Sequence, residues 1–102
     1  MKGVPVNDWM FDDPPNVAVL TTVQVLQGDS ILYVSHDKRD GVWQFHTGLM
    51  GTELEEADAR VVALQRIIEL DPSIEQLAEL PLGWVATREN VSNGWKLLEL
   101  DM

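Results

Sequence analysis

Two mainly apolar runs flank a charged tip near the middle of the chain, and this pattern predicts a β-hairpin over residues 31–48. The tip ends in Asp40 and Gly41, a pair of residues that favours a tight turn. The tip is also long enough for a bulge or a wider loop. We take this hairpin as the centre of the predicted fold.

One register of the hairpin is favoured by the alternation of its side chains. Leu32 and Val34 fall on one face, and Trp43 and Phe45 share that face in this register. The opposite face then carries three other apolar residues, Ile31, Tyr33 and Val42. The sequence also allows a second register, with Tyr33 beside Phe45.

Four more strands are expected along the chain. Residues 16–22 are β-branched and apolar without clean alternation, which is typical of an interior strand covered on both faces. Residues 59–64 predict a further buried strand. Residues 83–90 and 95–100 predict two last strands, paired across a loop that contains Asn93-Gly94.

Short helices are expected between these strands. Thr22 is placed to cap a helical turn that stops before Gly28. Residues 65–70 predict a second short helix. Asp71 and Pro72 then suit the cap and the first position of a third helix, whose apolar stripe would face the sheet.

Residues 1–15 are rich in Pro and Asp and predict an N-terminal arm. Trp9, Met10 and Phe11 most simply pack this arm onto the body; an exposed partner-binding patch is the alternative. Over residues 16–102 we expect one α+β domain, with a mainly antiparallel sheet and short helices on one face.

The chain of 102 residues contains no cysteine, so disulfides and cysteine-ligated metal sites are excluded. This composition suits a reducing cytoplasm, and we expect a cytoplasmic protein. The N-terminus has no apolar signal segment, and no run approaches the roughly 20 apolar residues of a membrane-spanning helix. We therefore expect neither export nor a membrane partner.

The formal net charge is −10, from 17 acidic and 7 basic residues. Such a charge repels the phosphates of nucleic acids and anionic membranes, so we expect no nucleic-acid partner. It favours a basic partner protein, although many acidic proteins use their charge only for solubility.

Residues suited to catalysis do not gather in any motif that we recognise. His36 and His46 flank the hairpin tip and form a conceivable metal or acid–base pair, but two histidines without a third ligand are far short of a zinc signature. We expect ordinary hydrogen-bonded histidines, a chain that is not an enzyme, and no metal or cofactor.

Aromatic residues offer a second functional hypothesis. Tyr33, Trp43 and Trp84 could line a pocket for a small or regulatory molecule, although core packing is the usual role of such rings. Arg88 could form an ion pair with an acid or stack over a ring.

Several short motifs occur in a specific order: Val34-Ser35, Asp40 to Phe45 followed by Gly48, Asp71-Pro72-Ser73, and Leu80 to Gly83 leading to Arg88. In this order they resemble a bacterial domain family of unknown biochemical activity, grouped with the immunity proteins of polymorphic toxin systems. The resemblance covers residues 17–95. It implies a small α+β fold and a non-enzymatic role in which the chain binds and neutralises a toxin.

If that role applies, the net charge favours a basic toxin as partner. Two acidic segments are then the contact candidates. The first is the hairpin tip, with Asp37, Lys38, Arg39 and Asp40. The second is the loop that follows the hairpin, with Glu53, Glu55, Glu56 and Asp58.

The oligomeric state is open. The run from Trp95 to the C-terminus could form an edge strand that pairs with a second copy. Lys96 and Glu99 protect mildly against such pairing.

Overall fold

The computed structural model describes residues 9–48 and 56–100 of the chain. It is an α+β fold built on a six-stranded sheet. The strands are β1 (Ala18–Thr22), β2 (Tyr33–His36), β3 (Trp43–His46), β4 (Ala59–Ala63), β5 (Trp84–Thr87) and β6 (Lys96–Glu99). The helices are α1 (Val23–Leu26) and α2 (Leu64–Leu70), with the 3-10 helices η2 (Glu56–Asp58) and η3 (Pro72–Leu77).

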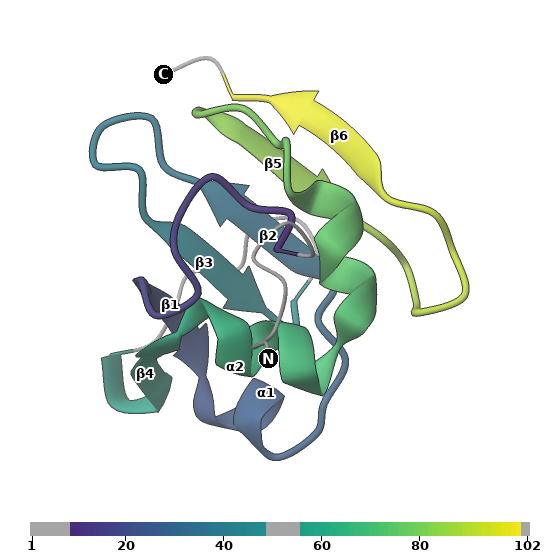
Figure 1. The fold of residues 1–102 in the computed structure, drawn as a ribbon. Coiled ribbons are helices and arrows are strands. Elements are labelled where there is room, and N and C mark those ends of the chain that lie inside the picture. The colour runs from purple at the N-terminus through teal and green to yellow at the C-terminus, as the bar shows by residue number, and fades with distance from the viewer. Residues whose placement is uncertain (1–8, 49–55, 101–102) are drawn as a thin grey trace, which may run out of the picture.

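The strands lie in the order β4-β1-β3-β2-β5-β6, so β4 and β6 are the two edges of the sheet (Figure 1). β1 and β3 pair in parallel, while the other four pairings are antiparallel. The predicted mainly antiparallel sheet is therefore confirmed.

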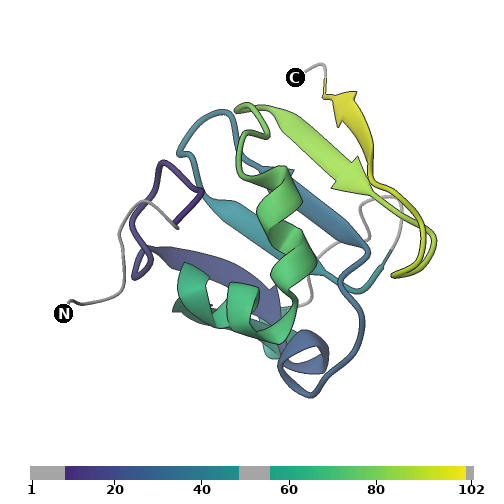
Figure 2. The same cartoon turned by 45° about the vertical axis from the view of Figure 1, so that its right-hand side comes forward.

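Both α2 and η3 lie on the same face of the sheet (Figure 2). The core fills the space between these two helices and the strands. Its buried members are Phe11, Val19, Val25, Ile31, Val34, Trp43, Phe45, Leu64, Ile67, Ile74, Leu77, Leu80 and Ala86.

The favoured register of the hairpin is confirmed. Val34 lies opposite Phe45, and His36 lies opposite Trp43, so these side chains share the face that the helices cover. One detail of the expectation is wrong: Ile31 is in the core at 1% exposure, whereas Leu32 is only half-buried. The regular alternation of side chains in β2 begins at Tyr33. Before this strand the Ile31 carbonyl accepts a hydrogen bond from the Arg88 side chain, so the two predicted faces do not extend to Ile31 and Leu32.

The expected helix ends are also present. The Thr22 side chain accepts a hydrogen bond from the Val25 amide at the start of α1, and Gly28 follows the helix with a φ of 110°. The Asp71 side chain accepts from the Ser73 amide at the start of η3, where Pro72 is the first residue. This third helix is therefore capped as predicted.

One expectation about burial is wrong, and a second is met only in part. Residues 59–64 were expected to form a buried strand, but β4 is an edge strand in which Arg60 and Val61 are exposed. β1 does lie inside the sheet as expected, and on the face away from the helices Thr22 is buried and Leu20 half-buried, whereas Ala18 is exposed, so this second face is covered only in part. Apolar composition alone does not tell an edge strand from a central one.

The N-terminal arm packs onto the body through its aromatic residues. Phe11 is buried at 6% exposure, and Trp9 packs against the same core, whereas Met10 is exposed. Residues 1–8 lie outside the described part of the chain. Within residues 9–48 and 56–100, no helix has the length and hydropathy needed to cross a membrane.

Candidate functional site

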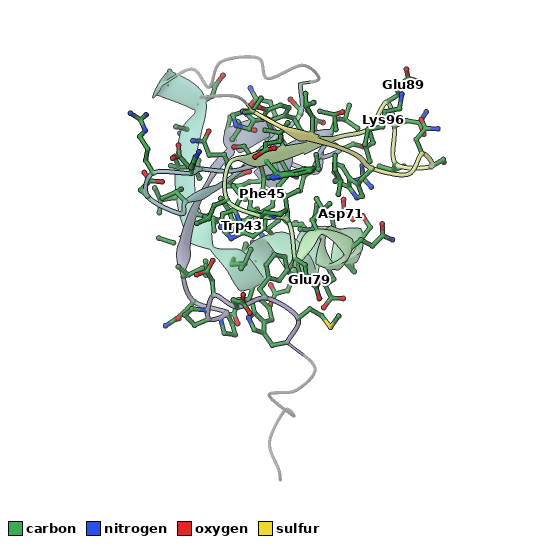
Figure 3. The ribbon with its side chains drawn as sticks, turned by 90° about the horizontal axis from the view of Figure 1, so that it is seen from above. Trp43, Phe45, Asp71, Glu79, Glu89 and Lys96 are labelled. Atoms are coloured by element: carbon green, nitrogen blue, oxygen red, sulfur yellow. The ribbon has the colours of Figure 1, made fainter. Side chains whose placement is uncertain are left out.

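A hollow of about 200 Å³ opens where the arm meets the end of η3 and the hairpin. We call it the acidic hollow. Its lining comes from three parts of the chain: Asp12 and Asp13 from the arm, His36 and Trp43 from the hairpin, and Ala78, Glu79, Leu80, Pro81 and Leu82 from the segment after η3. In Figure 3, Trp43 and Phe45 lie between the sheet and the helices, with Glu79 on the helix side.

Asp13 is fixed in place by two indole rings. Its carboxylate oxygen Oδ2 accepts a hydrogen bond from Nε1 of Trp43 at 2.9 Å, and its backbone carbonyl accepts one from Nε1 of Trp9. Phe11 packs edge-on against Trp43, with ring centroids 5.3 Å apart. The arm therefore brings a carboxylate to the rim of the hollow in a defined position.

The floor of the hollow is a stacked pair of rings. His36 lies parallel to Trp43, with ring centroids 3.9 Å apart and an interplanar angle of 15°. Nδ1 of His36 lies 2.8 Å from the carbonyl oxygen of Leu80. Because a carbonyl oxygen only accepts, a hydrogen bond between these two atoms requires the proton on Nδ1.

The charges around the hollow are of one sign. Three of its lining residues, Asp12, Asp13 and Glu79, carry carboxylates, and none of the lining residues that the structure describes is Lys or Arg. Asp12 and Glu79 are exposed at the rim. Carboxylates that line one hollow attract a cationic group, most readily the end of a Lys or Arg side chain.

A larger hollow of about 270 Å³ lies at the other end of η3, and one of its two charged lining residues is already engaged within the protein. It is lined by Val25, Gly28, Asp29, Ser30, Ile31, Leu70, Asp71 and Val91. Asp71 is engaged within the protein, because Oδ1 accepts from Ser73 and Oδ2 accepts from Arg88. We therefore take the smaller acidic hollow as the candidate site.

Arg88 both forms an ion pair and stacks over a ring, the two roles expected for it. Its guanidinium is bonded to Asp71 at 2.7 Å, to the Ser73 hydroxyl at 3.1 Å and to the Ile31 carbonyl at 3.0 Å. Trp95 covers it, with the guanidinium carbon 4.1 Å from the ring centroid. Since Arg88 is only 3% exposed, this network holds the fold together.

The hairpin tip uses its acids to shape its own backbone. Asp37 accepts from the Arg39 amide, and Asp40 accepts from the Val42 amide. The aliphatic part of the Lys38 side chain lies over Gly83, 3.4 Å from where a β-carbon would stand. These bonds shape the turn, and the tip keeps charges of both signs. Its contact with a partner stays a prediction.

The acidic loop after the hairpin is described only at its end. Glu53 and Glu55 lie outside the described residues, and Glu56 begins η2. Asp58 accepts a hydrogen bond from Nε2 of Gln24 at 3.2 Å, which ties the end of the loop to α1. The predicted role of this loop in binding is not tested by the geometry.

The three aromatic residues of the second hypothesis do not share a pocket. Trp43 and Trp84 both pair with His36 and face the helices, whereas Tyr33 pairs with His46 on the opposite face of the sheet. A pocket lined by all three rings is therefore wrong, because alternation in β2 separates them.

The two histidines are separated in the same way. His36 faces the acidic hollow, while His46 lies on the opposite face, where Nε2 is 3.1 Å from the Gln44 side-chain oxygen. The two rings cannot bind one metal ion together. Burial lowers the pKa of His46 and raises the pKa of Tyr33, because desolvation disfavours the charged form of each.

Comparisons with known proteins do not assign a function to this hollow. No family model, curated protein or solved structure matched the chain. The sequence pattern had also not indicated the acidic hollow, because Asp12 and Asp13 belong to the arm and Glu79 lies 66 residues beyond Asp13. The only local signal was the pair of acids directly after the apolar Trp9 to Phe11 segment.

Proposed function

We propose that this chain is a non-enzymatic binding domain of the immunity-protein type, which neutralises a basic toxin by accepting a Lys or Arg side chain of that toxin in the acidic hollow. The observation that carries the proposal is that three residues with carboxylates, Asp12, Asp13 and Glu79, line one hollow together with the stacked rings of His36 and Trp43.

The anchoring of Asp13 supports a binding role for this hollow. Trp43 and Trp9 fix the position of Asp13 before any partner arrives, so little conformational freedom is lost when a cation binds. Asp13 is partly buried beside the ring of Trp43, which reduces its contact with water and so strengthens its attraction to a cation. Both features increase the affinity that a single basic side chain can supply.

The charge of the whole chain supports the same partner. A net charge of −10 attracts a basic protein over distances of roughly 10 Å at moderate salt and accelerates encounter. Contact at the hollow then selects for a protruding Lys or Arg. The motif order from Val34 to Arg88, which resembles the immunity-protein grouping, is consistent with this role.

Co-expression with the toxin encoded beside this gene tests the function. The full chain should protect the cell and co-purify with the toxin domain, and the complex should weaken steeply with added salt. Failure of the chain to protect the cell and to bind the toxin would overturn the proposal.

A double substitution tests the site. Asp12→Asn with Glu79→Gln removes two rim charges without touching Asp13, and should raise the Kd for the toxin about tenfold or more, or about 1.4 kcal/mol. The matched control, Glu69→Gln with Glu89→Gln, removes the same charge elsewhere; Figure 3 shows Glu89 well away from Glu79. Equal weakening in both pairs would show that only net charge matters and would reject the hollow as the site.

A further inference from the structure

The last strand of the sheet leaves an apolar edge uncovered. β6 has β5 on one side, and no described strand lies on its other side (Figure 1). All four of its residues are exposed: Leu97 is 52% exposed and Leu98 is 61% exposed. Leu100, just after the strand, is 36% exposed. An exposed edge with this composition promotes pairing with another strand.

The hydrogen bonds to β5 show which backbone groups of β6 point outward. The amide of Leu100 donates to the carbonyl of Gly83, and β6 continues the same antiparallel register with Leu98 opposite Val85. In an antiparallel pair, alternate residues bond to the neighbouring strand. Leu98 and Leu100 therefore bond toward β5, and the N–H and C=O groups of Leu97 and Glu99 face away from it.

We infer that β6 pairs antiparallel with β6 of a second copy of this chain, about a two-fold axis that passes between the two Leu98 residues. In this register Leu97 lies opposite Glu99 of the second copy, and the reverse. Every outward N–H and C=O group within β6 then gains a partner, which gives four hydrogen bonds. The sheet would continue across the axis as twelve strands, twice the six of one chain.

The two-fold symmetry decides this register. The axis must be perpendicular to the sheet, so the face that the helices cover continues as the same face in the second copy, and only residues of equal parity can lie opposite each other. In a register with Leu97 opposite Leu97 of the second copy, Glu99 would pair with Trp95 of the second copy. That register would need the backbone of Trp95, which lies outside β6. Leu98 opposite itself uses β6 alone and places two exposed leucines at the closest cross-strand distance.

The composition of β6 suits a second copy as the occupant of this edge. β6 contains one cation and one anion, Lys96 and Glu99, so it is locally neutral in a chain whose net charge is −10. The edge offers no charge that would select a basic partner, and the like charges that a second copy brings near each other within β6, the two Glu99 carboxylates, stand on a diagonal and not directly opposite. The aliphatic part of Lys96 also lies opposite Leu100 of the second copy and covers it.

A single cysteine tests the register, because the chain has none of its own. In Leu98→Cys the two sulfur-bearing residues would stand at about 4.5 Å between Cα atoms, a distance that a disulfide can bridge. In the control Leu97→Cys the two introduced cysteines, one in each copy, would lie about 7–8 Å apart on a diagonal, which is too far for a disulfide. Under mild oxidation Leu98→Cys should form a disulfide-linked dimer at least tenfold faster. Equal rates would overturn the register.

The association itself is tested by sedimentation of the full chain over a range of concentrations. We expect a weak dimer that dissociates on dilution, because pairing of one short strand gives a small interface. Leu98→Glu places two carboxylates opposite each other and should keep the chain monomeric. Val91→Glu, in the β5–β6 loop at 58% exposure, is the matched control and should still dimerise. A wild-type chain that stays monomeric at millimolar concentration would overturn the inference.

This inference and the proposed function fail independently. Figure 3 shows Lys96 of β6 far from Glu79 of the acidic hollow. A monomeric chain could still bind a toxin, and a dimer could form in a chain that protects against nothing.

Discussion

Arg88 and Asp71 form an ion pair that joins the sheet to the helices. Nη2 of Arg88 lies 2.7 Å from Oδ2 of Asp71, the residue that caps η3, and the Arg88 side chain is almost fully buried. A buried guanidinium is costly to desolvate unless its N–H groups are bonded, and here three of its nitrogens are bonded. The pair therefore fixes the start of η3 against the end of β5.

Loss of this pair should be among the most damaging single changes in the chain. Arg88→Met leaves the Asp71 carboxylate without its cation and leaves the Ile31 carbonyl without a donor. We expect the free energy of unfolding to fall by about 3 kcal/mol, measured by urea titration. The control is Arg66→Met, which breaks the exposed ion pair to Glu69 at 3.8 Å and should cost less than about 0.5 kcal/mol. Similar losses in both variants would contradict a special role for Arg88.

Gly28 should resist substitution for a backbone reason alone. Its φ is 110°, and a β-carbon placed there would meet no atom within 4 Å. Gly28→Ala should therefore cost about 1–2 kcal/mol of stability through backbone strain, without any steric clash. Gly94→Ala, also in open space but without a positive φ, should be neutral or stabilising by up to about 1 kcal/mol. Thermal unfolding of the two variants checks the sign of the difference.

His46 should make the fold less stable in mild acid. Burial lowers its pKa below the usual value of 6.5, so below pH 6.5 the unfolded chain takes up a proton that the folded chain binds less readily. Stability contributed by the neutral ring is therefore present above pH 6.5 and is lost as the pH falls toward the lowered pKa. His46→Gln removes this one titrating group and is the matched comparison.

The measurement is a pair of urea titrations for each protein, at about pH 7.5 and about pH 5.5. His46→Gln should lose less stability than the wild type between the two values. If both proteins lose the same amount, His46 does not carry this pH dependence.

Asp13 should hold the arm rather than the whole fold. Asp13→Ala removes the acceptor of the Trp43 indole N–H and should cost about 1 kcal/mol of global stability. Amide hydrogen exchange in residues 9–17 should accelerate by a larger factor than exchange in β3. Asp12→Ala, at an exposed neighbouring residue, should leave both rates unchanged. Uniform acceleration in Asp13→Ala would mean that the arm does not open separately.

Local signals along the chain predicted most of the elements correctly. The Thr22 cap, the Asp71-Pro72 start of η3 and the faces of Val34, Trp43 and Phe45 depend on neighbours a few residues away or on simple alternation. The same signals missed the exposure of β4, because strand order in a sheet is set by contacts between distant segments.

The candidate site was beyond local prediction for the same reason. The acidic hollow exists only because the arm folds back so that Asp13 meets Trp43, 30 residues later. The aromatic pocket failed because Tyr33 and Trp43 looked close in sequence pattern but stand on opposite faces of the sheet.

By itself, then, the sequence determined the acidic charge, the absence of cysteine, the hairpin and the helix caps, all of which depend on composition or on short-range geometry. Only the tertiary structure decided that three residues with carboxylates line one hollow, that Arg88 is buried against Asp71, and that β6 is an edge strand of the described sheet. These features arise from segments far apart in the chain, and their positions follow from the packing of one shared core.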